Sequence, residues 1–212
     1  VGSPPTQTRS AGHRFRSRLE ARWAVFFDVM KIRWEYEPQG YLITDPWEDE
    51  SRAYLPDFFL PDMDVWVEVK GDPAGVDWPL WGCAVDNWSH SRLPDSALAY
   101  SGAEGNGSAL VVLGNIPAHS EWVWAHPMLV NRKGVQIGEI YFDPDYDKGF
   151  WDIDSELGVF DSSWSGFTGS PYWHIEPDHS GRPYRGYLPM HKHVAMAYRK
   201  ARQARFEHGV AG

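Results

Sequence analysis

The sequence is poor in cysteine, in long apolar runs and in basic charge. A single cysteine, Cys83, excludes an internal disulfide and a zinc site built from paired cysteines, and it favours a reducing compartment such as the cytoplasm. No run of about 18 apolar residues occurs, so we expect no membrane span. A glycine-rich phosphate loop and the nucleophile elbow of serine hydrolases are also absent, which argues against those two classes of enzyme.

The net charge of -9 argues against a protein that binds nucleic acid over its whole surface. The charge is unevenly distributed, however. Residues 9–33 carry seven Lys or Arg against two acids, and residues 181–212 carry seven against one, so the middle of the chain is acidic. Two basic ends are compatible with a local DNA-binding face on an acidic body. An alternative of equal weight is that these basic residues lie on helix faces that contact only solvent.

A chain of 212 residues suits one domain, or one domain with a large appendage. Residues 1–12 are rich in Pro, Ser, Thr and Gly and lack the apolar segment of a secretion signal, so we predict a disordered tail. Apolar residues spaced by three and four indicate an amphipathic helix over about 14–31. The terminal helix is expected over about 190–208, stopped by Gly209.

Between these helices the sequence predicts mainly strands, which gives an α/β fold: a small mixed sheet flanked by helices. We expect a polar loop over 45–52, a short helix near Trp78–Trp88, and irregular structure or short β pieces over 150–171. Strands are expected over 32–37, 41–44, 54–60, 65–70, 108–113, 121–126 and 135–142.

The segment VWVEVK (65–70) carries the chemistry. Side chains alternate between the faces of a strand, so the three valines face one side, while Trp66, Glu68 and Lys70 face the other. The preceding strand can place Asp57 opposite them across a hairpin. Two carboxylates, with the Val69 carbonyl as a further oxygen, are ligands that Mg²⁺ accepts, and a nearby ammonium can orient an attacking water. A structural ion pair between Glu68 and Lys70 is the alternative interpretation.

The order of motifs strengthens the first interpretation. PDFFLP (56–61) followed by WVEVKG (66–71) resembles the core motif of the PD-(D/E)XK nuclease superfamily. FRSRLE (15–20) is similar to the first-helix motif of phage junction-resolving endonucleases and of the endonuclease subunit of heteromeric transposases, and YEP (36–38) fits the strand before the catalytic hairpin. The family normally continues with a helix and a further strand, which Val111–Leu113 can supply.

The resemblance covers about a third of the chain and implies roles for individual residues. Asp57 and Glu68 match the two acids, Lys70 the lysine, and Glu20 the helix-borne acid that adds to the metal shell. The implied fold is restriction-endonuclease-like, with a nuclease core over 13–117 and a C-terminal extension of the same domain over 118–212. The implied cofactor is Mg²⁺, with Mn²⁺ as a substitute.

The expected partner is DNA, with RNA left open and a homodimer as one arrangement. We expect an Mg²⁺-dependent endodeoxyribonuclease, acting on branched or mobile-element DNA by the same resemblance. The alternative is a DNA-binding or protein-interaction module on a nuclease-like scaffold without turnover. Basic side chains that could contact backbone phosphates, or simply be solvated, are Arg16, Arg18, Arg199, Arg202 and Arg205.

Overall fold

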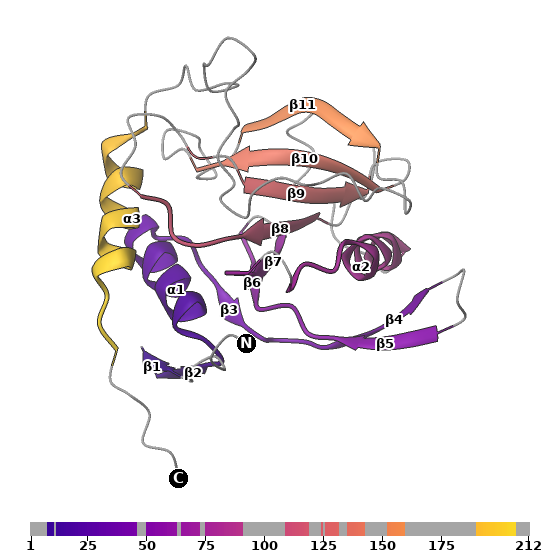
Figure 1. The fold of residues 1–212 in the computed structure, drawn as a ribbon, viewed down its shortest axis with the longest axis horizontal. Coiled ribbons are helices and arrows are strands. Elements are labelled where there is room, and N and C mark those ends of the chain that lie inside the picture. Colours follow the sequence, from indigo (N-terminus) through magenta and orange to yellow (C-terminus); the bar gives the residue numbers. More distant parts are fainter. Residues whose placement is uncertain are drawn as a thin grey trace.

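A seven-stranded mixed sheet forms the centre of the computed structural model, with helices on both of its faces (Figure 1). Mixed α/β architecture is therefore confirmed. The residues that the structure describes are 8–10, 12–45, 50–62, 65–72, 75–90, 109–118, 124, 126–131, 135–142, 152–159 and 190–206. None of the described helices is long and apolar enough to cross a membrane.

The strand order of the sheet is β11-β10-β9-β8-β7-β6-β3. Only β7 and β8 run parallel among these neighbours; the other pairs are antiparallel. The strands are β3 (Glu35–Tyr36), β6 (Phe58–Leu60), β7 (Val65–Val69), β8 (Ala109–Leu113), β9 (His126–Asn131), β10 (Val135–Tyr141) and β11 (Asp152–Val159). Two separate hairpins are β1 (Thr8–Ser10) with β2 (His13–Phe15), and β4 (Tyr41–Asp45) with β5 (Glu50–Tyr54).

Helix α1 (Arg18–Met30) begins where Ser17 caps it and ends at Lys31. The Ser17 hydroxyl accepts the backbone N–H of Glu20, which satisfies one of the open amides of the first turn. Lys31 adopts a left-handed backbone (φ 60°) and its N–H returns to the carbonyl of Asp28, which closes the helix. The buried stripe of α1 includes the predicted Trp23, Phe26 and Met30.

The two faces of β7 pack against different helices. Val65, Val67 and Val69 belong to the apolar cluster that includes α1 and α3 (Lys192–Gln203), whereas Trp66 belongs to the cluster that includes α2 (Trp78–His90). Figure 1 shows α1 and α3 on one side of the sheet and α2 on the other. The alternation predicted for VWVEVK is confirmed, and it leaves Glu68 on the same face as Trp66.

Helix α3 packs along α1 in the opposite direction. The ring Nε2 of His193, near the start of α3, lies 3.0 Å from the carbonyl of Val29, near the end of α1. Further along, the rings of Tyr198 and Phe26 stack at 4.6 Å. The basic end of α3 therefore lies beside the start of α1, so the described parts of both basic ends of the sequence meet on one side of the molecule (Figure 1).

Several predicted boundaries near the N-terminus were wrong. Thr8–Ser10, expected in a disordered tail, pairs with His13–Phe15, so the first helix starts at Arg18 rather than at about 14. The strand expected over 32–37 is reduced to Glu35–Tyr36. Residues 1–7 and 11 of the expected tail lie outside the described residues.

Two strands were misplaced by pattern reading. The stretch 54–60 is not one strand: β5 ends at Tyr54, and β6 begins at Phe58 after Pro56, which has no N–H for a sheet ladder. The expected polar loop over 45–52 in fact contributes Glu50 to Arg52 to β5. Of the strand expected over 121–126, Trp124 is not in a strand and His126 begins β9 (His126–Asn131), while 121–123 and 125 lie outside the described residues.

The helix near Trp78–Trp88 and the strands near 65–70, 108–113 and 135–142 are confirmed, with ends within two residues. Within the region expected to hold irregular structure or short β pieces, Asp152–Val159 forms a strand that pairs with β10, with a shift of register between Ile137 and Glu139. The terminal helix is confirmed but shorter, ending at Gln203. Its contacts with α1 show that the described end of the extension packs on the core.

Candidate active site

Three acids from three different elements are buried at the carboxyl end of β7. Glu20 comes from the first turn of α1, Asp57 precedes β6, and Glu68 is on β7; their exposed fractions are 6%, 3% and 3%. The pairing of Phe58 with Val67 places Asp57 and Glu68 at the next opposed positions of the hairpin, as predicted. Buried carboxylates need hydrogen-bond partners or counter-ions, and each of the three has them.

Asp57 accepts a hydrogen bond on each carboxylate oxygen. The backbone N–H of Val69 donates to Oδ2 at 2.7 Å, which fixes the carboxylate against β7. The guanidinium of Arg16 donates from Nη2 to Oδ1 at 2.9 Å. Arg16 also forms an ion pair with Glu37 through its Nε. Oδ2 is thus tied to the sheet, whereas Oδ1 is held only by a side chain.

Glu68 is held by a cation and by a neutral donor. Lys70 Nζ lies 2.6 Å from Oε1, and the hydroxyl of Tyr54 donates to Oε2 at 2.8 Å. Lys70 remains one-third exposed, so its ammonium reaches the surface while its partner stays buried. The predicted Glu68–Lys70 pair therefore exists, and it stands next to Asp57 rather than apart from it.

Glu20 is bound to the start of its own helix and to the edge strand. Its Oε2 accepts the backbone N–H of Arg16 at 3.0 Å and the hydroxyl of Tyr36 at 2.6 Å. The Ser17 cap fixes the backbone of Glu20 at the same time. This is a variant of the capping box, in which the acid reaches back one residue beyond the cap. The helix-borne acid is therefore brought to the cluster, as predicted.

The acids influence one another electrostatically. Burial raises the pKa of Asp57 well above its ordinary value, and the nearby charges of Glu68 and Glu20 raise it further. Burial works to lower the pKa of Lys70, but the Glu68 carboxylate outweighs it, so that pKa lies above the usual range. The raised pKa of Asp57 shows that carboxylates are crowded at this position, so an additional cation there would favour the ionised form of Asp57.

Sequence reasoning missed three residues of this site: Tyr36, Tyr54 and Glu37. Both tyrosines donate to the acids from outside the hairpin, and burial together with the neighbouring carboxylate raises the pKa of each hydroxyl. Glu37 has a positive φ of 46°, and its N–H donates to the carbonyl of Asp57 at 3.0 Å. Tyr36 and Glu37 lie in the YEP motif, which was used as a strand marker only.

The five basic residues predicted to contact DNA separate into groups. Arg16 lies in the cluster, and Arg18, Arg199 and Arg205 are exposed. Arg202 is half-buried and donates from Nη1 to the carbonyl of Pro117. Pro117 follows β8, whose carboxyl end adjoins that of β7 because the two strands are parallel. The basic end of α3 is therefore attached to the sheet edge that carries Glu68 and Lys70.

The metal ligands predicted from sequence do not form a preassembled site. Among the described residues, no group of three or more His, Cys, Asp or Glu side chains is arranged to hold a metal ion. Arg16 and Lys70 contact the acids instead. Two carboxylates and a backbone carbonyl suffice for Mg²⁺, which keeps several of its waters, so the oxygen donors suit that ion in chemistry.

No family model, curated protein or solved structure matches this chain. The functional assignment of the site therefore depends on the geometry of the described residues.

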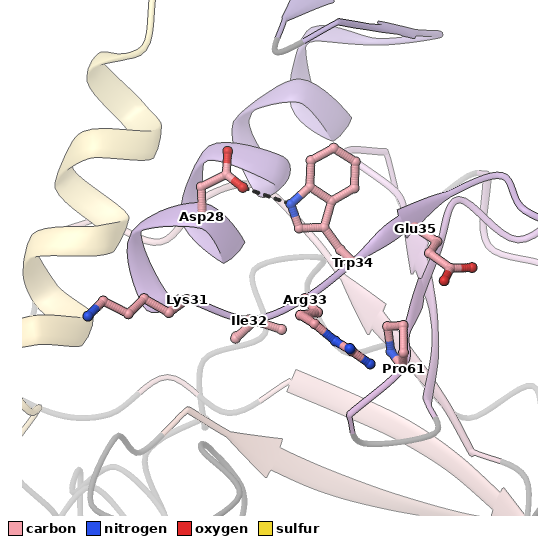
Figure 2. Close-up of a pocket in the computed structure, with 7 residues that line it drawn as sticks. All are labelled: Asp28, Lys31, Ile32, Arg33, Trp34, Glu35 and Pro61. Atoms are coloured by element: carbon pink, nitrogen blue, oxygen red, sulfur yellow. Dashed lines mark hydrogen bonds between the residues drawn. The ribbon is translucent and has the colours of Figure 1, made fainter.

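A surface pocket of about 540 Å³ lies at the other end of the edge strand (Figure 2). In Figure 2, the indole N–H of Trp34 bonds to the carboxylate of Asp28, a distance of 2.9 Å, while Arg33 extends past Pro61. None of the residues that line the pocket belongs to the acid cluster. Its lining residues are Asp28, Lys31, Ile32, Arg33, Trp34, Glu35 and Pro61.

Proposed function

We propose that this protein is a metal-dependent DNA endonuclease of the PD-(D/E)XK type, with a restriction-endonuclease-like fold. The observation that carries the proposal is the meeting of three buried carboxylates, Glu20, Asp57 and Glu68, with Lys70 at one end of β7. Buried, mutually repelling acids destabilise a fold, and such clusters are more often retained for chemistry than for stability.

The order of elements supports the proposal. A helix bearing one acid precedes an antiparallel hairpin bearing the other two, and a helix then leads to a strand parallel to β7. This is the continuation that the resemblance implies: helix α2 and strand β8 follow the hairpin. The element order alone fits other α/β proteins too, so the argument depends on the residues at the strand ends.

The residues that would hold Mg²⁺ are Asp57 and Glu68, with the Val69 carbonyl, and Glu20 as a supporting acid. Bound Mg²⁺ would neutralise charge on the scissile phosphate. Lys70, one-third exposed and paired with Glu68, can orient a water molecule and stabilise negative charge that develops on the phosphate. Tyr54 and Tyr36 hold Glu68 and Glu20 in place by hydrogen bonds.

A plasmid-nicking assay with Mg²⁺, Mn²⁺ or chelator tests the proposal. We expect cleavage with either metal and none with chelator. Asp57→Asn and Lys70→Met should each reduce the rate by about 100-fold or more, because they remove a ligand or a charge-stabilising cation. Matched controls are Asp62→Asn and Lys31→Met, an exposed acid and an exposed lysine outside the cluster, which should retain activity. Full activity of either site variant, with its fold intact, would refute the assignment.

A second candidate is a DNA-binding or protein-interaction module without turnover. It is favoured by one observation: each acid of the cluster already has protein partners, and no three-ligand group exists among the described residues. The same assay separates the two, because a module would shift DNA in a gel without nicking it. Branched, linear and RNA substrates in parallel would show which nucleic acid the protein acts on.

A further inference from the structure

Arg16 covers Asp57 from the surface. The Arg16 side chain is 52% exposed, whereas that of Asp57 is 4% exposed, and the two meet at Oδ1. The other oxygen, Oδ2, is committed to the backbone N–H of Val69. A cation that binds Asp57 from this side therefore competes with Arg16 for Oδ1.

The backbone and the side chain of Arg16 are held differently. Its N–H lies 3.0 Å from Glu20 Oε2 and 2.9 Å from the Tyr36 hydroxyl, so the main chain is anchored to the site. The side chain beyond it is long and half exposed. Its departure from Asp57 needs only rotation about side-chain bonds, and water can solvate the released guanidinium.

The charge balance explains why a cation is present at this position. Lys70 is already paired with Glu68, so it is not the direct partner of Asp57. Glu37, whose left-handed backbone places it beside Asp57, provides the second contact for the guanidinium. Arg16 thus bridges an acid of the cluster and an acid at its rim.

We propose that Arg16 is an internal counter-ion that occupies the metal-binding oxygen of Asp57 and leaves it when a divalent cation binds. The inference rests on the proposed function, because it assigns a ligand exchange to the same site. Once released, the guanidinium lies at the rim, where its planar donor set suits a phosphate group of the nucleic acid. Arg16 is then a positioning residue that couples metal entry to backbone binding.

Calorimetric titration of Mn²⁺ into wild type and Arg16→Gln tests this exchange. Because the variant has no cation to displace, we expect it to bind Mn²⁺ about tenfold more tightly than wild type. In chelator, its melting temperature should be lower than that of wild type, and Mn²⁺ should raise it by a larger increment. Arg33→Gln is the matched control: Arg33 is also exposed, its partner Asp62 is exposed, and neither quantity should change.

The outcomes separate the inference from the function. Equal or weaker Mn²⁺ binding by Arg16→Gln, with clear binding by wild type, overturns the inference and leaves the nuclease proposal standing. Absence of Mn²⁺ binding in both proteins overturns both. If Arg16→Gln does not fold, Arg16→Lys replaces it: a lysine has one nitrogen and cannot span Asp57 and Glu37 as Nη2 and Nε of Arg16 do, so it is held less firmly and we expect Mn²⁺ binding tighter than that of wild type. Unchanged affinity in that variant also rejects the exchange.

Discussion

The two oxygens of the Glu68 carboxylate have different kinds of partner. Lys70 contacts one oxygen as a cation, and Tyr54 donates to the other as a neutral hydroxyl. The charge of Lys70 is available to a substrate, while the hydroxyl of Tyr54 is buried and serves only to orient. Mutating Lys70 and mutating Tyr54 should therefore have different effects on the protein.

Replacing Tyr54 by Phe should weaken the site more than the fold. The change leaves a buried carboxylate oxygen without its donor, which costs about 1–3 kcal/mol of unfolding free energy, and it frees Glu68 to rotate. We expect lower Mn²⁺ affinity and slower nicking. The control is Tyr198→Phe, which removes a buried hydroxyl bonded to His126 in the core and should lower stability alone. Equal nicking rates for the two variants would contradict the orienting role.

His126 makes the stability of the fold depend on pH. It is fully buried, and burial lowers its pKa from the ordinary 6.5 to about 3. Below pH 6.5 this histidine takes up a proton in the unfolded chain but not in the native fold. The free energy of unfolding therefore has its full value above pH 6.5 and falls as the pH drops toward 3. The loss is at most about 1.4 kcal/mol per pH unit.

Urea unfolding at pH 7.5, 6.0 and 5.0 measures this dependence. The variant His126→Leu should flatten the profile over that range, and substitution of the exposed His13 by Ala should leave it unchanged. A wild-type profile no steeper than that of His126→Leu would mean that His126 gains a proton in the native state.

At the scale of elements, the start of α1 links helix stability to the site. Ser17 caps the helix through Glu20, and Glu20 is one of the acids. Ser17→Ala should cost about 1 kcal/mol and also loosen Glu20, so nicking should fall. The comparable cap of α3 is His191, whose ring Nδ1 accepts the backbone N–H of His193 at 3.1 Å. His191→Ala removes this cap. That control should lose similar stability with nicking unchanged; a matching loss of activity would argue against a special role for the α1 cap.

The elements near the hairpin were predictable because their signals are local. Alternation along VWVEVK decides which residues of β7 are buried against which helix, and it places Glu68 correctly. The β4–β5 hairpin was harder to predict from the sequence, because β5 begins with Glu50, Ser51 and Arg52, polar residues that are typical of a loop. Its role also depends on distant packing: Ile43 and Tyr54 lie in the apolar cluster of α2.

The partners of the acids were not predictable for a related reason. Arg16 is 41 residues from Asp57, and the contact exists only because β2, the Ser17 cap and the edge strand fix its backbone. No period or motif in one sequence encodes such a pair. A polar side chain beside a Pro, as in YEP, is the one local signal that could have drawn attention to Glu37.

At the scale of the whole molecule, packing shows how an acidic chain can carry a local basic surface, as the proposed nucleic-acid substrate requires. The described parts of both basic ends meet where α3 lies beside α1, on the side of the sheet that supplies Glu20. Arg202 anchors this end of α3 to the loop after β8. The negative charge elsewhere keeps binding local, and binding should be sensitive to salt.

Arg199→Gln combined with Arg205→Gln tests this arrangement. Both side chains are exposed at the end of α3 nearest the start of α1. We expect weaker DNA binding and a shallower dependence of affinity on salt, by up to about two units of slope. Lys192→Gln, at the opposite end of the same helix, is the control and should keep the slope of wild type. A double variant with an unchanged slope would place the DNA elsewhere.

Helix α1 carries Glu20, yet its aromatic face is covered by α3, a segment about 170 residues further along the chain. During synthesis, the ribosome would release every acid of the cluster long before the helix that completes the packing of α1. Helix α1, and with it the position of Glu20, would therefore lack this packing partner until α3 has emerged.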